Sequence, residues 1–158
     1  MNCGNNHGFW TFALNLYAVP GAQDALLTVQ DVHGGDVMAV LWALAASAEG
    51  KRLSRSDIAI YTAATASAAQ TAIECRSLRK RLKSGPRAAY TAAKADELAA
   101  ERAVAASAPD PFQAGIKSPD QQAQLTSSNL ALFLDALTPP VPPTLREMLI
   151  RLPTAQKA

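Results

Sequence analysis

The sequence predicts an all-α protein, a compact single-domain bundle of about six to seven helices. Apolar residues recur every three to four positions along most of the 158 residues. Gly and Pro divide these stretches into pieces of helical length. Alanine, the strongest helix former, supplies much of the 49% hydrophobic content. Alternation with a period of two residues is nowhere long enough to predict a strand.

The first two helices are predicted by aromatic and aliphatic spacing. A polar tail over residues 1–7 precedes a helix over about 8–18, which is apolar on two faces. Pro20 and Gly21 then break the chain, and a second helix runs from there to Val32. Two consecutive glycines follow, and they are expected to end that helix.

Asp36 is a good N-cap for a third helix over residues 37–48, which Gly50 ends. The residues expected to form its buried stripe are Val37, Val40, Leu41 and Leu44, with Trp42 beside them. This helix has the most apolar sequence of the chain, so we expect it to contribute to the core.

The middle of the chain predicts two charged helices. Ser54 or Ser56 can cap a helical pattern that continues to about Lys83, with an alanine- and threonine-rich tract as its weakest part. Ser, Gly and Pro at positions 84–86 stop it. Residues 87–107 contain no Gly or Pro and predict a largely exposed helix.

The last third combines proline-rich connections with two more helices. In order, these are a linker over about 108–118, a helix over 119–137, a proline-rich turn over 138–143 and a short helix over 144–152. We expect Phe112 and Ile116 to pin the linker to the core and Ser118 to cap the helix that follows. Asn129 lies on an apolar helix face and is expected to bond a backbone carbonyl.

Composition predicts a cytoplasmic protein. Cys3 and Cys75 are too few for a disulfide framework, so free thiols in a reducing compartment are expected. The N-terminus lacks the basic residues of a signal peptide, and the apolar stretches are shorter than the ~20 residues that span a bilayer. A net charge of +2 is too small to attract nucleic acid or membranes at long range, so such binding would depend on local clusters.

Several elements occur in a characteristic order. They are Phe9-Trp10, Phe12, Leu16-Tyr17, Pro20-Gly21, Leu26, Leu27, Gln30-Asp31, His33-Gly34 and Asp36-Val37, followed by Leu41-Trp42, the basic run 78–83, the run 95–102, Asn129-Leu130 and Phe133-Leu134. This order resembles a proteobacterial family of small uncharacterised helical proteins. The resemblance implies a compact helical fold and transfers no catalytic residue. The family pattern has Asn where this sequence has Met38.

The most polar cluster in an apolar region consists of Gln30, Asp31, His33 and Asp36, and the last three are the candidate site residues. Carboxylates beside an imidazole can bind a metal or share a proton. The alternative is ordinary turn chemistry, in which Asp36 caps a helix and Asp31 bonds the loop. The two His and two Cys residues lack a recognised metal spacing, so we predict no structural metal and no cofactor.

A basic stripe is the second candidate site. Arg76, Arg79, Lys80 and Lys83 share one helix face and could bind a phosphate backbone or an acidic partner. The alternative is a solvated face that acids of the next helix, Asp96, Glu97 and Glu101, partly neutralise.

Aromatic residues form the third candidate site, because Phe9, Trp10, Phe12 and Tyr17 could line a ligand pocket or belong to the core. Three hypotheses follow. The leading one is a non-enzymatic protein that binds a macromolecule, most simply a protein, through the basic stripe or the aromatic N-terminal face. The second is an enzyme site at Asp31, His33 and Asp36, lined by Trp10 and Tyr17. The third is weak nucleic-acid binding through the basic residues of 76–87, which requires them to be exposed and unpaired.

Overall fold

The computed structural model describes residues 7–155, with side chains from residue 8 onward. Within this range the chain forms seven helices and one two-stranded sheet, so the all-α class is confirmed. The helices are α1 (His7–Tyr17), α2 (Ala22–His33), α3 (Val37–Ala48), α4 (Arg55–Leu82), α5 (Arg87–Ser107), α6 (Gln122–Leu134) and α7 (Pro143–Ala155). The strands β1 (Lys51–Arg52) and β2 (Ile116–Lys117) pair antiparallel.

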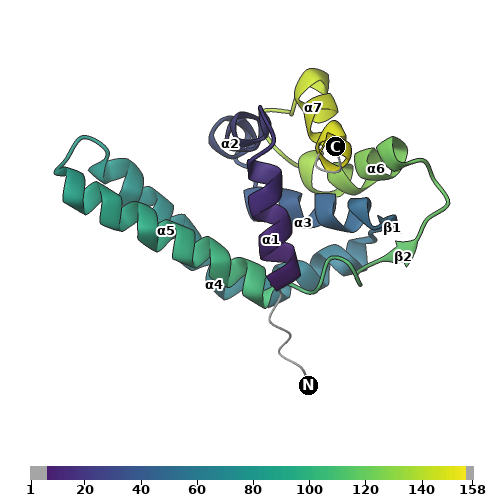
Figure 1. The fold of residues 1–158 in the computed structure, drawn as a ribbon, viewed down its shortest axis with the longest axis horizontal. Coiled ribbons are helices and arrows are strands. Elements are labelled where there is room, and N and C mark those ends of the chain that lie inside the picture. The colour runs from purple at the N-terminus through teal and green to yellow at the C-terminus, as the bar shows by residue number, and fades with distance from the viewer. Residues whose placement is uncertain (1–6, 156–158) are drawn as a thin grey trace.

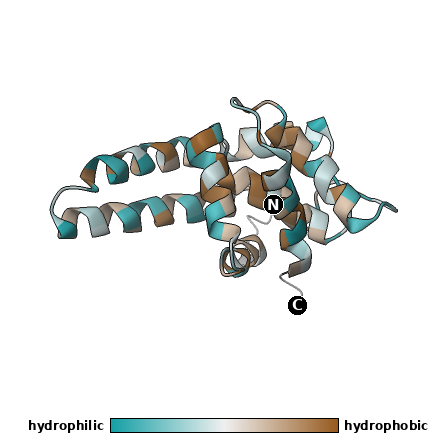
Figure 2. Ribbon diagram, turned by 90° about the horizontal axis from the view of Figure 1, so that it is seen from above, coloured by the Kyte–Doolittle hydropathy of each residue, from teal (hydrophilic) through white to brown (hydrophobic). Residues whose placement is uncertain are grey.

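The molecule has two visibly different parts (Figure 1). Helices α4 and α5 form a long antiparallel hairpin that projects from the rest, and the remaining helices gather into a helical body around α3. The 28 residues of α4 make a helix of about 42 Å at 1.5 Å per residue. Hydrophobic residues concentrate in the helical body, whereas hydrophilic residues are more frequent along the hairpin (Figure 2).

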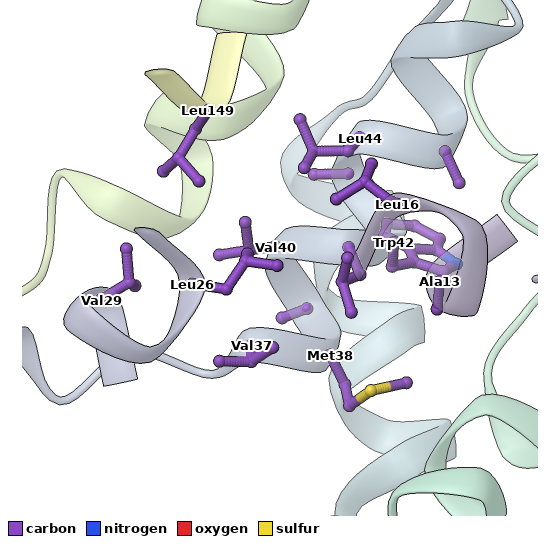
Figure 3. Packing of buried hydrophobic residues seen from close by; sticks show 14 of the residues in the cluster. Ala13, Leu16, Leu26, Val29, Val37, Met38, Val40, Trp42, Leu44 and Leu149 are labelled. Carbon is purple, nitrogen blue, oxygen red and sulfur yellow. The ribbon is translucent and has the colours of Figure 1, made fainter. Parts of the chain in front are cut away.

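Helix α3 is the centre of the core. All residues from 37 to 47 are buried, so the predicted stripe of Val37, Val40, Leu41 and Leu44 was too narrow. The reason is that α3 contacts α1, α2, α5, α6, α7 and β1, so neighbours pack on more than one of its faces. Figure 3 shows its side chains between Leu16 of α1 and Leu26 of α2, with Leu149 of α7 close by.

The turn from α2 to α3 is built as its residue types predict. Gly34 adopts the left-handed conformation, with φ of 69°, that ends a helix readily when no Cβ is present. A Cβ on Gly35 would lie 2.5 Å from Cγ1 of Val29, so this position also requires glycine. Asp36 caps α3 by accepting a hydrogen bond from the backbone N–H of Ala39 at 3.2 Å. These contacts fix the direction in which α3 enters the core.

Two anchors hold the base of the hairpin. At its start, Ser54 and Asp57 form a capping box, which confirms Ser54 as the cap. After its end, the indole N–H of Trp42 donates to the carbonyl of Pro109 at 2.8 Å, while the Trp42 ring packs on Tyr61 with centroids 4.8 Å apart. Helix α4 is continuous through its alanine- and threonine-rich tract, because pairing with α5 supports it along its length.

The linker differs from prediction at two points. Phe112 packs edge-on against Phe12, with centroids 6.1 Å apart, as expected for a pinning residue. Ile116 instead lies in β2 and is 79% exposed, so it does not pin the linker. Ser118 does not cap α6, which begins only at Gln122; its hydroxyl accepts from the N–H of Asp120. The short pairing of β1 with β2 holds the linker at Ile116, whereas Phe112 packs against the core.

A buried polar side chain joins α6 to the segment between α3 and α4. Asn129 is fully buried and donates to the carbonyl of Lys51 at 2.8 Å, which confirms the expected backbone bond. It also donates to the hydroxyl of Ser47 at 2.9 Å and accepts from the N–H of Leu53 at 2.9 Å. Three hydrogen bonds thus satisfy both ends of its amide.

The predicted polar tail lies almost entirely outside the described residues. Residues 1–6 of the polar tail, Cys3 among them, are not described, and residue 7 already belongs to α1. Cys75 is a free thiol, partly buried on α4. Among the residues from 7 to 155, no helix combines the length and apolar character needed to cross a bilayer.

Candidate binding groove

A groove of about 460 Å³ lies where the hairpin meets the helical body. Its apolar lining comes from Trp10, Ala13, Leu14 and Tyr17 of α1, Leu27 of α2, Met38 and Leu41 of α3, and Ala95 and Leu98 of α5. Its polar lining comes from Gln23, Arg79, Lys94, Glu97 and Glu101. The volume falls within the range of ligand-binding sites, and such sites are likewise mainly apolar with few polar groups.

The walls of this groove include two large apolar side chains that are open to solvent. Leu14 is 50% exposed and Leu98 is 53% exposed. They come from helices α1 and α5, far apart in sequence, yet they line the same hollow. Concave apolar surface that remains in water costs free energy, and a bound molecule would remove that cost.

A carboxylate pair faces two arginines along the hairpin. Glu97, only 8% exposed, accepts a hydrogen bond from Nε of Arg76 at 3.3 Å and a second from Nε of Arg79. Nη2 of Arg76 also lies 3.7 Å from Oε1 of Glu101. The hydrogen bond that Arg79 donates to the carboxylate of Glu97 raises the pKa of Arg79. Arg76 and Arg79 are therefore neutralised by Glu97 and Glu101 of the next helix. This is the alternative that we considered for the basic stripe.

The surroundings of this cluster disfavour further negative charge. Burial raises the pKa of Glu101, and the nearby charge of Glu97 raises it further. Burial likewise raises the pKa of Tyr17 to about 12, with a smaller contribution from Glu101. The tyrosine therefore stays neutral at physiological pH and offers its phenol as a hydrogen-bonding group.

Lys80 connects the hairpin to α2. Its ammonium donates to Oδ1 of Asp31 at 2.8 Å, and this hydrogen bond lowers the pKa of Asp31. Both side chains are about half exposed. Lys83, the fourth member of the stripe, is exposed just beyond the end of α4. Three of the four stripe residues are thus paired with carboxylates.

The structure does not bring Asp31, His33 and Asp36 together. Residues two positions apart on a helix point in nearly opposite directions, and the three side chains have separate partners. His33 is buried and donates from Nδ1 to the carbonyl of Pro139 at 2.6 Å, whereas Asp31 binds Lys80 and Asp36 caps α3. In the described part of the chain, no three His, Cys, Asp or Glu side chains are grouped to hold a metal ion.

Of the four aromatic candidates, Trp10 and Tyr17 line the groove and are partly buried. Phe9 is instead fully buried in the core, and Phe12 packs against Phe112. Sequence reasoning did not select Leu14, Leu98 or Glu101 as site residues. A signal for Leu98 existed, because it is a large apolar residue on a helix that was expected to be exposed. The groove forms because α5 of the hairpin packs against α1. No local sequence pattern predicts this packing.

One family comparison covers this site. The model of the family described as "Protein of unknown function (DUF2390)" matches residues 8–107, which include the helices that line the groove. No curated protein and no solved structure matches the chain. Because the match spans more than half of its length, the chain belongs to the family "Protein of unknown function (DUF2390)".

Proposed function

We propose that this protein binds a protein partner, without catalysis, through the groove between the hairpin and the helical body. The main support for this proposal is that Leu14 and Leu98, each about half exposed, line the same groove of about 460 Å³. This surface suits an amphipathic helix, which inserts apolar side chains from one face into a groove. The aromatic side chains of Trp10 and Tyr17 add contact area at low entropic cost.

The form of the groove favours a protein segment over a small molecule. A small-molecule pocket buries most of its ligand and encloses it. Here Leu14 and Leu98, which line the groove from α1 and α5, are each about half exposed to solvent. A helix that lies along the groove can cover both of these side chains and bury more apolar surface than a small molecule does.

The other two hypotheses receive less support. The residues of the enzyme hypothesis are engaged in capping, in a backbone hydrogen bond and in an ion pair. Nucleic acid would have to compete with carboxylates for Arg76, Arg79 and Lys80. A cytoplasmic location remains part of the proposal, and the free thiol of Cys75 supports it.

Site-specific photo-crosslinking in the native cell tests the proposal. A benzoylphenylalanine is placed at Leu98, and in a matched control at Ile60, an exposed residue of α4 that does not line the groove. We expect one discrete adduct from position 98 and none from position 60. Leu14→Glu places a charge in the groove at a half-exposed position, so it should abolish the adduct without unfolding the protein.

The same experiment can contradict the proposal. Equal adducts from both positions, or an adduct that survives Leu14→Glu, would show that the groove is not the contact. Circular dichroism of each variant verifies that the helices are intact.

A further inference from the structure

The two carboxylates beside the groove are unequally neutralised. Glu97 and Glu101 are four residues apart on α5 and therefore share a face. Glu97 takes the Nε–H groups of both Arg76 and Arg79. The contact of Glu101 with Arg76, at 3.7 Å, is longer than a hydrogen bond. Glu101 thus keeps acceptor capacity that the arginines do not use.

The position of Glu101 makes this capacity accessible from the groove. Its side chain is 21% exposed and lines the hollow together with Trp10 and Tyr17. A carboxylate that has lost most of its water gains more from a charged donor than a fully hydrated one does. Aromatic rings nearby also attract cations through their faces.

The two basic side chains that line the groove, Arg79 and Lys94, do not pair with Glu101. Arg79 is bound to Glu97. The ammonium of Lys94 lies 5.7 Å from the centroid of the Tyr90 ring, one turn toward the start of α5. Glu101 lies seven residues in the other direction from Lys94, about 10 Å along the helix at 1.5 Å per residue.

We infer that the partner helix carries a lysine or arginine that enters the groove and pairs with Glu101, next to apolar residues that cover Leu14 and Leu98. Leu98 precedes Glu101 by three residues, so the two lie about one turn apart on α5. The basic residue of the partner is therefore expected about one turn from an apolar residue that contacts Leu98. This inference rests on the proposed function, and it adds the chemistry of the partner.

A display library of 16-residue amphipathic helical peptides tests the inference with the full-length protein. Peptides are selected on the wild type and counter-selected on the Leu14→Glu variant, which leaves only groove-dependent binders. We expect these binders to share Lys or Arg at one fixed position. Replacing that residue by Gln should weaken binding to the wild type about tenfold, the effect of one charge-assisted hydrogen bond.

A double-mutant cycle then assigns the contact. Glu101→Gln should lower the affinity of the protein for the selected peptide by the same factor. It should also abolish the preference for Lys or Arg over Gln at that peptide position. The control Glu147→Gln alters an exposed carboxylate of α7 outside the groove and should leave the affinity unchanged.

The outcomes separate the two proposals. Groove-dependent peptides without a shared basic residue, or a basic residue whose effect persists in Glu101→Gln, would contradict the inference and leave the proposed function standing. An absence of any groove-dependent peptide would contradict the proposed function and this inference with it.

Discussion

The amide of Asn129 on α6 donates a hydrogen bond to the hydroxyl of Ser47 on α3, 2.9 Å away, inside the core. Ser47 in turn donates to the carbonyl of Ala43 at 2.7 Å, and its own carbonyl accepts from Gln122 at 2.6 Å. This chain of bonds fixes α6 against the end of the central helix. It also holds the segment from which the hairpin departs.

Asn129→Ala should lower the free energy of unfolding by about 3 kcal/mol, because it leaves the buried N–H of Leu53 and the carbonyl of Lys51 without this partner. Urea denaturation followed by circular dichroism measures the loss. The control Asn15→Ala, at an exposed position of α1, should change stability by less than about 0.5 kcal/mol. A loss at position 129 no larger than that at position 15 would contradict the structural role of the amide.

Glu97→Gln should lower the free energy of unfolding by about 2 kcal/mol, because it leaves two partly buried guanidinium groups facing a neutral amide. Glu101→Gln should not lower the free energy of unfolding at neutral pH, because its carboxylate is less well paired. Thermal unfolding of both variants at low and high salt measures the difference. Equal losses would show that the arginines divide their interaction evenly between the two carboxylates.

The stability of the Glu101→Gln variant relative to wild type should depend on pH. Because the folded state raises the pKa of Glu101 above its ordinary value of 4.5, the ionised carboxylate disfavours folding at neutral pH. Its unfavourable effect disappears on acidification, once the group is protonated in both states. The Gln variant should therefore be at least as stable as wild type at pH 7, and this advantage should vanish below about pH 4.5. Urea titrations across this range would contradict the prediction if the advantage grew on acidification.

Tyr61→Phe should raise the free energy of unfolding by about 1 kcal/mol. Tyr61 is 2% exposed, and within the described residues its hydroxyl is buried without a hydrogen-bond partner, which costs desolvation free energy. The ring contacts with Trp42 and Phe133 remain in the variant. Tyr61→Leu is the contrasting control, since it removes those ring contacts and should destabilise. A clear loss of stability in the Phe variant, measured by urea denaturation, would contradict the unsatisfied state of the hydroxyl.

Local signals predicted most of the helices. Pro20, Gly21 and the glycines after α2 mark chain breaks that follow from backbone sterics alone. Asp36 and Ser54 cap helices through contacts with residues three positions away, so the adjacent sequence is enough to predict their role. The prediction was wrong where the conformation depends on a residue far away in the sequence. Ile116 is an example, because it lies in a strand that pairs with β1.

The candidate site was less predictable for the same reason. Arg76 and Arg79 share a helix face in any helix, but their pairing with Glu97 depends on the register of the hairpin, across 21 and 18 residues. Asp31 and His33 are close in sequence, yet helical geometry turns them apart. The groove arises between α1 and α5, whose contact is long-range. The sequence therefore predicted some residues of the groove, such as Trp10 and Tyr17. It did not predict that Leu98 lines the groove with them.

Both arms of the hairpin are fastened beside the same indole, since Trp42 packs on Tyr61 of the outgoing helix and bonds Pro109 after the returning one. Lys80 also ties the outgoing helix to α2, so the turn beyond Lys80 can change in length without disturbing either this ion pair or the contacts at the base. Adding seven residues to each arm near the exposed turn at 84–86 would preserve the facing side of both helices. The distance to which this protein reaches is thus free to vary independently of its core.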